Sequence, residues 1–158
     1  MFKVGDYVVY KRNVCTIKEL KEGKYYVLSP IDDKSLTISI LIDKANLVLR
    51  KTITKEECEK LIDSIPNIDI IKVNDKLMEN EYKSLFNTGK LEDLIKIIKT
   101  AYLRNYDRIL NHKKISEKDD NYFNKAETLL YNELSISLGK SYEETKKYVI
   151  EKVESLKK

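Results

Sequence analysis

The stretch DYVVYKRNVCTIKEL, residues 6–20, sets the character of the first third of the chain. It is rich in Val, Tyr, Ile and Thr, which favour β-strands. Similar runs follow at 24–30 (KYYVLSP), 35–42 (SLTISILI) and 46–49 (NLVL). Turn residues separate them, notably Glu22-Gly23 and the segment 30–34. With two strands in residues 6–20, DYVVYK and VCTIKEL, this makes five short strands in a short segment, which predict a small curled sheet or barrel.

One of these runs also shows which of its faces is buried. In Leu36-Thr37-Ile38-Ser39-Ile40 apolar and hydroxyl residues alternate strictly. Side chains alternate between the two faces of a strand, so the apolar ones should face a core and Thr37 and Ser39 should face outward. The sequence therefore predicts a strand with one buried face.

From Thr54 onward the apolar residues recur at helical spacing, and three expected helices begin with a capping box. The pairs are Thr54 with Glu57, Ser116 with Asp119, and Ser141 with Glu144. We expect helices at about 54–64, 77–87, 91–109, 122–134 and 142–153. The change of period near residues 50–52 predicts an α+β chain, with a β-barrel at 1–52 and an all-helical bundle at 53–158.

Composition narrows the function classes. Charged residues make up 35% of the 158, the formal net charge is only +4, and apolar residues occur throughout. Contact with nucleic acid would therefore need a local basic patch. The longest apolar run, 36–42, is far too short to span a membrane, and the start lacks a signal-peptide core, so we expect a cytoplasmic protein without membrane contact.

Residues that could support catalysis or metal binding are few and scattered. His112 has no partner at the spacing of a triad or metal site, and Cys15 and Cys58 are interpreted as buried apolar residues. Gly139-Lys140-Ser141 lacks the upstream glycine and the strand of a phosphate-binding loop, so it reads as a helix stop followed by an N-cap. We expect no enzyme, no catalytic or metal residues, no cofactor and no small-molecule ligand.

The string FKVGDYVVY, residues 2–10, resembles the start of the polymerase-interaction module shared by the CarD/CdnL regulators and the transcription-repair coupling factor. The resemblance extends over nearly the whole chain, through segments 25–28, 36–38, 82–83, 91–96 and 125–134. This chain lacks the length and the Walker motif of the coupling factor, a large motor. The stand-alone bacterial regulator is therefore the better match.

For the first domain, the resemblance implies a Tudor/SH3-like barrel that presents a strand edge to the RNA polymerase β subunit. The candidate edge contains Thr37, Ile38 and Ser39. The alternative is that this strand pairs with another strand of the same barrel. The family often has a basic residue where Ser39 stands, so other charges are also candidates for the polymerase contact: Arg12, Lys18 and Lys21.

For the second domain, the resemblance implies contact with double-stranded promoter DNA at the upstream edge of the bubble, where the family wedges a tryptophan into the minor groove. This chain has no tryptophan, and Met78 aligns with that position. Met78 is either the wedge or a residue packed in the bundle. Lys76 and Lys83 flank it and either contact phosphates or form a solvated helix face.

These inferences combine into a hypothesis of a monomeric transcription regulator that modulates the stability of the open promoter complex. One rival is a protein-only adaptor without DNA contact, which would lack a salt-dependent affinity for DNA. The other is a small enzyme, which would need a deep polar pocket near His112 or Cys58.

Overall fold

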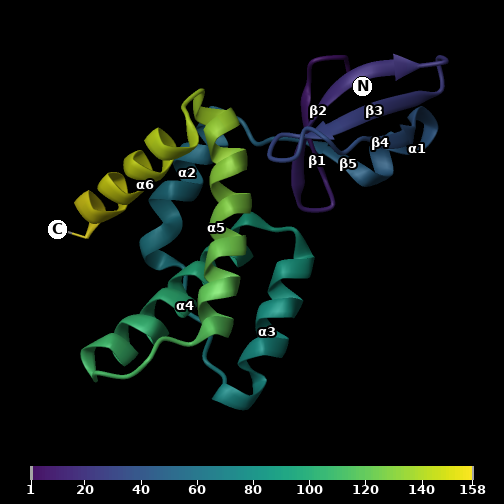
Figure 1. The fold of residues 1–158 in the computed structure, drawn as a ribbon. Coiled ribbons are helices and arrows are strands. Elements are labelled where there is room, and N and C mark those ends of the chain that lie inside the picture. The colour runs from purple at the N-terminus through teal and green to yellow at the C-terminus, as the bar shows by residue number, and fades with distance from the viewer. Residues whose placement is uncertain (1, 158) are drawn as a thin grey trace.

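The computed structural model describes residues 2–157 and arranges them as a β domain and a helical domain (Figure 1). The first part is a curled antiparallel half-barrel of five strands, and helices follow it. This arrangement confirms the α+β fold predicted from the sequence, a small β-barrel followed by a helical bundle. None of the helices described is long and apolar enough to cross a membrane.

The strands of the first domain all pair in antiparallel fashion, in the order β4-β3-β2-β1-β5. Their bounds are Tyr7–Tyr10 for β1, Asn13–Lys21 for β2, Tyr25–Pro30 for β3, Ile38–Leu41 for β4 and Leu49–Lys51 for β5. A bulge between Ile17 and Glu19 shifts the register of β2 against β3 and increases the local twist. The two terminal strands of this sheet are β4 and β5.

A short helix, α1 (Ile42–Val48), occupies most of the run at 46–49 that the sequence predicts as a strand. That prediction was wrong except at Leu49, where β5 begins. The chain leaves β4 at one edge of the sheet and must reach β5 beside β1 at the other. The connecting helix buries Ala45 in the barrel core, so tertiary packing overrides a strand-like composition.

The alternating run before α1 is shorter than predicted. Ile38 and Ile40 pack against the barrel core, as the alternation indicates. Leu36, expected on the same face, precedes β4 and is largely exposed. The strand therefore begins two residues later than the pattern predicts.

The helical domain holds α2 (Lys55–Ser64), a 3-10 turn η1 (Ile65–Asn67), α3 (Asp75–Thr88), α4 (Leu91–Leu110), α5 (Glu117–Leu138) and α6 (Tyr142–Leu156). Thr54 and Ser141 close the predicted capping boxes with Glu57 and Glu144. Ser116 accepts from the backbone N–H of Asp119. These caps satisfy backbone donors that a helix start leaves unpaired.

Each domain has an apolar core of its own. The barrel core includes Val8, Ile17 and Leu28, and the bundle core includes Ile62 and Leu134, all fully buried. Cys15 lies in the first core and Cys58 in the second, as the sequence predicts for buried apolar residues. Burial raises the pKa of each thiol to about 11, so both are protonated near neutral pH.

Candidate functional site

The edge strand β4 is the first candidate surface. Among the described residues it pairs with β3 and with no other strand, so its second side is open. The described sheet therefore contains no second partner strand for β4, which was the alternative considered from the sequence. An open strand edge presents backbone donors and acceptors that a strand of another protein can complete.

The direction of the backbone groups in β4 follows from one hydrogen bond. The N–H of Ile42 donates to the carbonyl oxygen of Lys24, just before β3, at 2.9 Å. Backbone groups of successive strand residues point to alternate sides, and the β3–β4 register is continuous from Tyr25 opposite Leu41 to Leu28 opposite Ile38. The N–H and C=O of Ser39, three residues earlier, therefore point away from β3 into the open edge.

The fold places the predicted polymerase-contact residues on different surfaces of the molecule. Thr37 and Ser39 are exposed, whereas Ile38 packs partly on the barrel core. Lys18 and Lys21 are exposed on β2, which β3 separates from the open edge. Arg12 faces the helical domain, where its guanidinium Cζ lies 4.6 Å from the centre of the Phe86 ring. The structure thus brings Thr37 and Ser39 together at the edge and places the three basic candidates elsewhere.

The exposed face of α3 is the second candidate surface. Lys76, Asn80, Lys83 and Asn87 lie at i, i+4, i+7 and i+11, so they share one side of the helix, and all four are exposed. Asn74 caps the helix start by accepting from the N–H of Leu77. This side therefore carries two free-standing ammonium groups and amide donors, the side chains that contact phosphate oxygens.

Met78 lies on the opposite, buried side of α3. It is 4% exposed and belongs to the bundle core with Tyr82. This is the packed alternative considered from the sequence. A wedge must reach between bases, and Met78 would have to leave the core to do so, so we do not include it in the proposed interface.

A buried carboxylate, Asp119, holds α3, α4 and α5 together beneath this surface. It accepts hydrogen bonds from Tyr82 Oη at 2.7 Å, Arg104 Nε at 3.0 Å and Arg108 Nη1 at 2.6 Å. Burial acts to raise the pKa of Asp119, but the three donors outweigh it and the pKa lies below its usual value. The network fixes α3 in position and presents its outer side.

A second buried carboxylate, Glu133 of α5, joins the two domains. Its oxygens accept from both Nη atoms of Arg50, each at 2.7 Å, and from the N–H of Ile53 at 2.9 Å. Ser137 donates to the carbonyl of Ile53 at 2.6 Å. Sequence reasoning missed this junction, although Glu133 falls on the same helical face as the apolar residues Ala126 and Leu130, which marks it as a buried acid.

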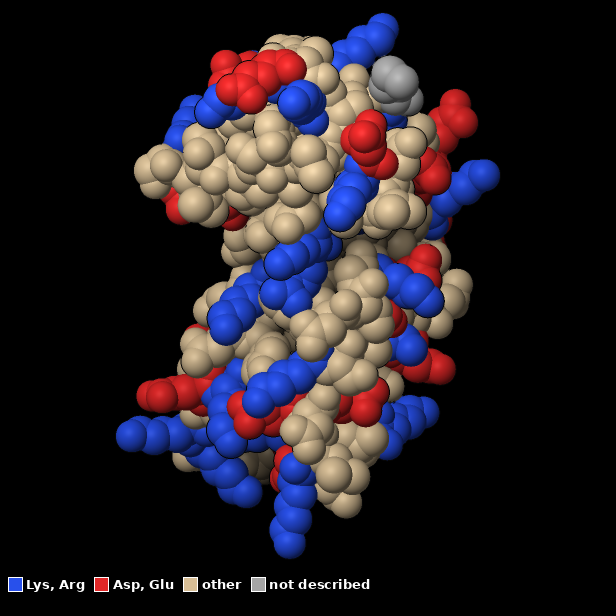
Figure 2. All heavy atoms as spheres, turned by 90° about the vertical axis from the view of Figure 1, so that its right-hand side faces the viewer, with Lys and Arg blue, Asp and Glu red and all other residues tan. Residues whose placement is uncertain are grey.

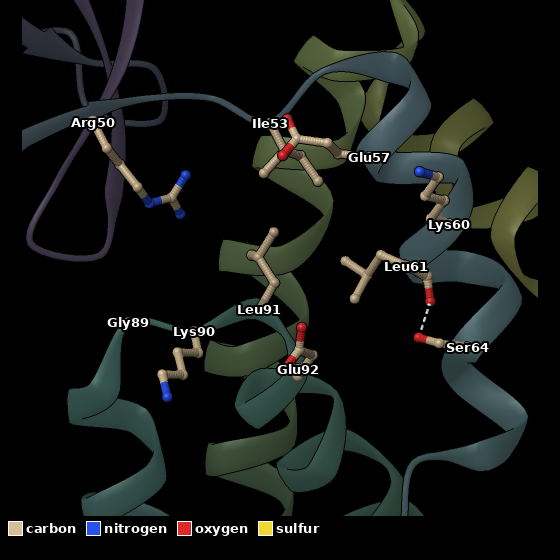
Figure 3. Close-up of a pocket in the computed structure, with 10 residues that line it drawn as sticks. All are labelled: Arg50, Ile53, Glu57, Lys60, Leu61, Ser64, Gly89, Lys90, Leu91 and Glu92. Carbon is tan, nitrogen blue, oxygen red and sulfur yellow. Dashed lines mark hydrogen bonds between the residues drawn. The ribbon is translucent and has the colours of Figure 1, made fainter.

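Beside this junction lies a hollow of about 720 Å³, lined by the domain link, α2 and the α3–α4 turn (Figure 3). Arg50, Lys60 and Lys90 face it together with Glu57 and Glu92. In Figure 3 the Arg50 side chain points into the space between the β domain and the helices. Neither Cys58 nor His112 lines this hollow.

Charge is unevenly spread over the side of the molecule that carries α3. Figure 2 shows Lys and Arg side chains across the waist between the domains and over the helical half, with acidic side chains interspersed. The mild net charge of the whole chain therefore conceals a locally basic face.

Comparison with known families bears on the β domain. Residues 2–53 match the family model described as the CarD-like/TRCF RID domain. The first domain is therefore similar to a CarD-like RID domain. The match supports a CarD-like assignment for the chain and, in general terms, a transcription factor that interacts with RNA polymerase. It ends at the domain link, before α2, so the helical domain lies outside the matched CarD-like region. The search of curated proteins found no match.

Proposed function

We propose that this chain is a transcription regulator that binds the RNA polymerase β subunit through β4 and contacts promoter DNA through α3. It acts as a monomer, without cofactor or catalysis. At the upstream edge of the bubble, contacts made only to melted DNA favour the open complex. About 1.4 kcal/mol of such differential binding changes the equilibrium about tenfold.

The observation that carries the polymerase half is the open side of β4. The strand is terminal in the sheet, lies within the CarD-like RID domain, and directs the N–H of Ser39 outward. Thr37, just before the strand, and Ser39 within it are exposed and uncharged, so neither side chain blocks a partner strand.

A proline at position 39 tests this contact. Ser39→Pro removes an N–H that points away from β3 and leaves the β3–β4 hydrogen bonds in place, because proline is tolerated on the free side of an edge strand. We expect at least about a tenfold loss of affinity for the β subunit in a pull-down or biosensor titration, since a backbone hydrogen bond and close strand pairing are both lost.

Ser39→Ala is the matched control, because it removes only the hydroxyl and should bind like the wild type. Circular dichroism and thermal unfolding must show that the proline variant keeps its fold. If a folded Ser39→Pro protein binds the β subunit normally, the edge is not the contact.

The DNA half rests on the exposed side of α3. We expect Lys76→Gln/Lys83→Gln to lower the slope of log affinity against log salt for duplex DNA by about 2, since each phosphate contact contributes about 0.9. Fluorescence anisotropy at several salt concentrations gives this slope. A wild-type chain without salt-dependent affinity would favour the protein-only adaptor.

A further inference from the structure

The turn between β1 and β2 carries a cation from the β domain onto the helical domain. Arg12 stacks its guanidinium on Phe86 of α3, and its Nη1 donates to Asn87 Oδ1 at 2.6 Å. Planar stacking holds a guanidinium in a fixed orientation while leaving its remaining N–H groups free to donate. The first domain thus places an oriented cation at the end of α3.

A second cation faces the same place from α5. Lys125 Nζ lies 5.8 Å from the centre of the Tyr122 ring, and Tyr122 meets Phe86 edge to face at 6.4 Å. Arg12 and Lys125 also line one hollow of about 470 Å³, together with Asn13, Asn124, Thr128, Phe86 and Leu129. None of these described lining residues is acidic.

This hollow continues the exposed side of α3. Asn87, which accepts from Arg12, is the last member of the set Lys76, Asn80, Lys83 and Asn87. From position 76 to 87 the helix rises about 16 Å, at about 1.5 Å per residue. Adjacent phosphates of one DNA strand are about 3.4 Å apart along the duplex axis, so this length matches roughly five of them.

We propose that the hollow formed by Arg12 and Lys125 contacts the phosphate backbone of the same duplex, extending the DNA surface of α3 onto the first domain. This inference rests on the proposed function, because it presumes that duplex DNA lies along α3. The donors present suit phosphate oxygens: a planar guanidinium, an ammonium, two amides and a hydroxyl, without a competing carboxylate.

In this proposal Arg12 contacts DNA, whereas the sequence analysis made it a candidate for the contact with polymerase. A duplex that lies on both Arg12 and Lys83 touches both domains at once, and the Glu133 junction keeps those domains in a set orientation. The open edge of β4 and the proposed DNA surface then keep a fixed position relative to each other.

The salt dependence of duplex binding by the intact chain tests this proposal. For Lys125→Gln and for Arg12→Gln we expect the log–log slope to fall by about 1 each, with weaker binding at every salt concentration. Arg12→Lys keeps the charge and should keep the slope, which separates loss of a phosphate contact from loss of packing on Phe86. Lys147→Gln changes the same charge on exposed α6, away from α3 in Figure 1, and should leave the slope unchanged.

The outcomes distinguish the two proposals. If Lys76→Gln/Lys83→Gln lowers the slope and Lys125→Gln does not, the hollow carries no phosphate and only this inference fails. If the wild-type chain shows no salt-dependent binding, both fail. Polyglutamate is the competitor that tests the other partner class: if it binds as tightly as DNA and with the same loss in Lys125→Gln, the hollow recognises acidic protein instead.

Discussion

A single buried carboxylate, Asp119, determines how α3 is held. It is 2% exposed and accepts from Tyr82, Arg104 and Arg108, while Arg104 also reaches Asp75 at 2.8 Å. Removing one member of such a buried network leaves the remaining members with an uncompensated charge and with unsatisfied hydrogen-bonding groups. The position of the outer side of α3 therefore depends on a buried residue that lies outside the proposed DNA surface.

We expect Asp119→Asn to lower the free energy of unfolding by about 3 kcal/mol in urea titrations. The folded-state pKa of Asp119 lies below its unfolded value of 3.8, so its contribution is complete above that pH and disappears as pH falls through the folded pKa. The wild type should therefore lose more stability than the variant on acidification below about pH 4.

Asp120→Asn is the neighbouring control, because among the described residues the Asp120 carboxylate accepts one long hydrogen bond, from Asn124 at 3.4 Å. We expect this variant to change the free energy of unfolding by no more than about 0.5 kcal/mol. Equal losses in the two variants would mean that the Asp119 network does not stabilise the bundle.

At the scale of elements, local signals predicted most helices. Side-chain caps mark the starts at Thr54, Ser116 and Ser141 because capping is a contact between residues close in sequence. The helix at 42–48 could not be predicted this way, because it forms to carry the chain across the sheet from β4 to β5. The requirement is topological, and no local pattern contains it.

The same distinction holds for the candidate site. The alternation at 36–40 predicted an exposed Thr37 and Ser39, and the seven-residue spacing of Lys76 and Lys83 is consistent with their shared face. For Met78 the sequence left two alternatives, a wedge or a packed residue, and the structure shows it buried on the same face as Tyr82, four residues later. The hydrogen bond of Arg12 with Asn87 of α3 joins residues 75 positions apart, and nothing local indicates it.

At the scale of the whole molecule, the Glu133 junction couples the two domains. Glu133 is 2% exposed and Arg50 is 42% exposed, so the pair reaches from the bundle core to the surface. Glu133 also accepts from the N–H of Ile53 in the link, and Ser137 of α5 donates to the C=O of the same residue. The domains should therefore unfold together.

The two cysteines report on this coupling, since each domain buries one and each thiol has a pKa of about 11. In the wild type we expect Cys15 and Cys58 to become reactive toward iodoacetamide over the same range of denaturant. In Glu133→Ala the two cysteines should become reactive over different ranges of denaturant. The free energy of unfolding of the bundle should fall by about 3 kcal/mol.

Glu127→Ala provides the comparison, because within residues 2–157 the Glu127 carboxylate pairs with Lys146 of the same bundle and bonds no residue of the barrel. In this variant the denaturant ranges over which the two cysteines become reactive should shift together. Separation in Glu127→Ala as well would show that any weakening of α5 uncouples the domains.

The shortness of β4 limits how firmly the proposed contact could hold polymerase. Two of its residues, Ser39 and Leu41, direct backbone groups outward, which allows about four hydrogen bonds worth about 1 kcal/mol each. That sum corresponds to a dissociation constant of about 1 mM. Tighter binding must come from apolar side chains in or beside the edge strand, such as Leu36 and Leu41, which are 48% and 40% exposed. The strand then sets the register of the complex, and the leucines set its lifetime.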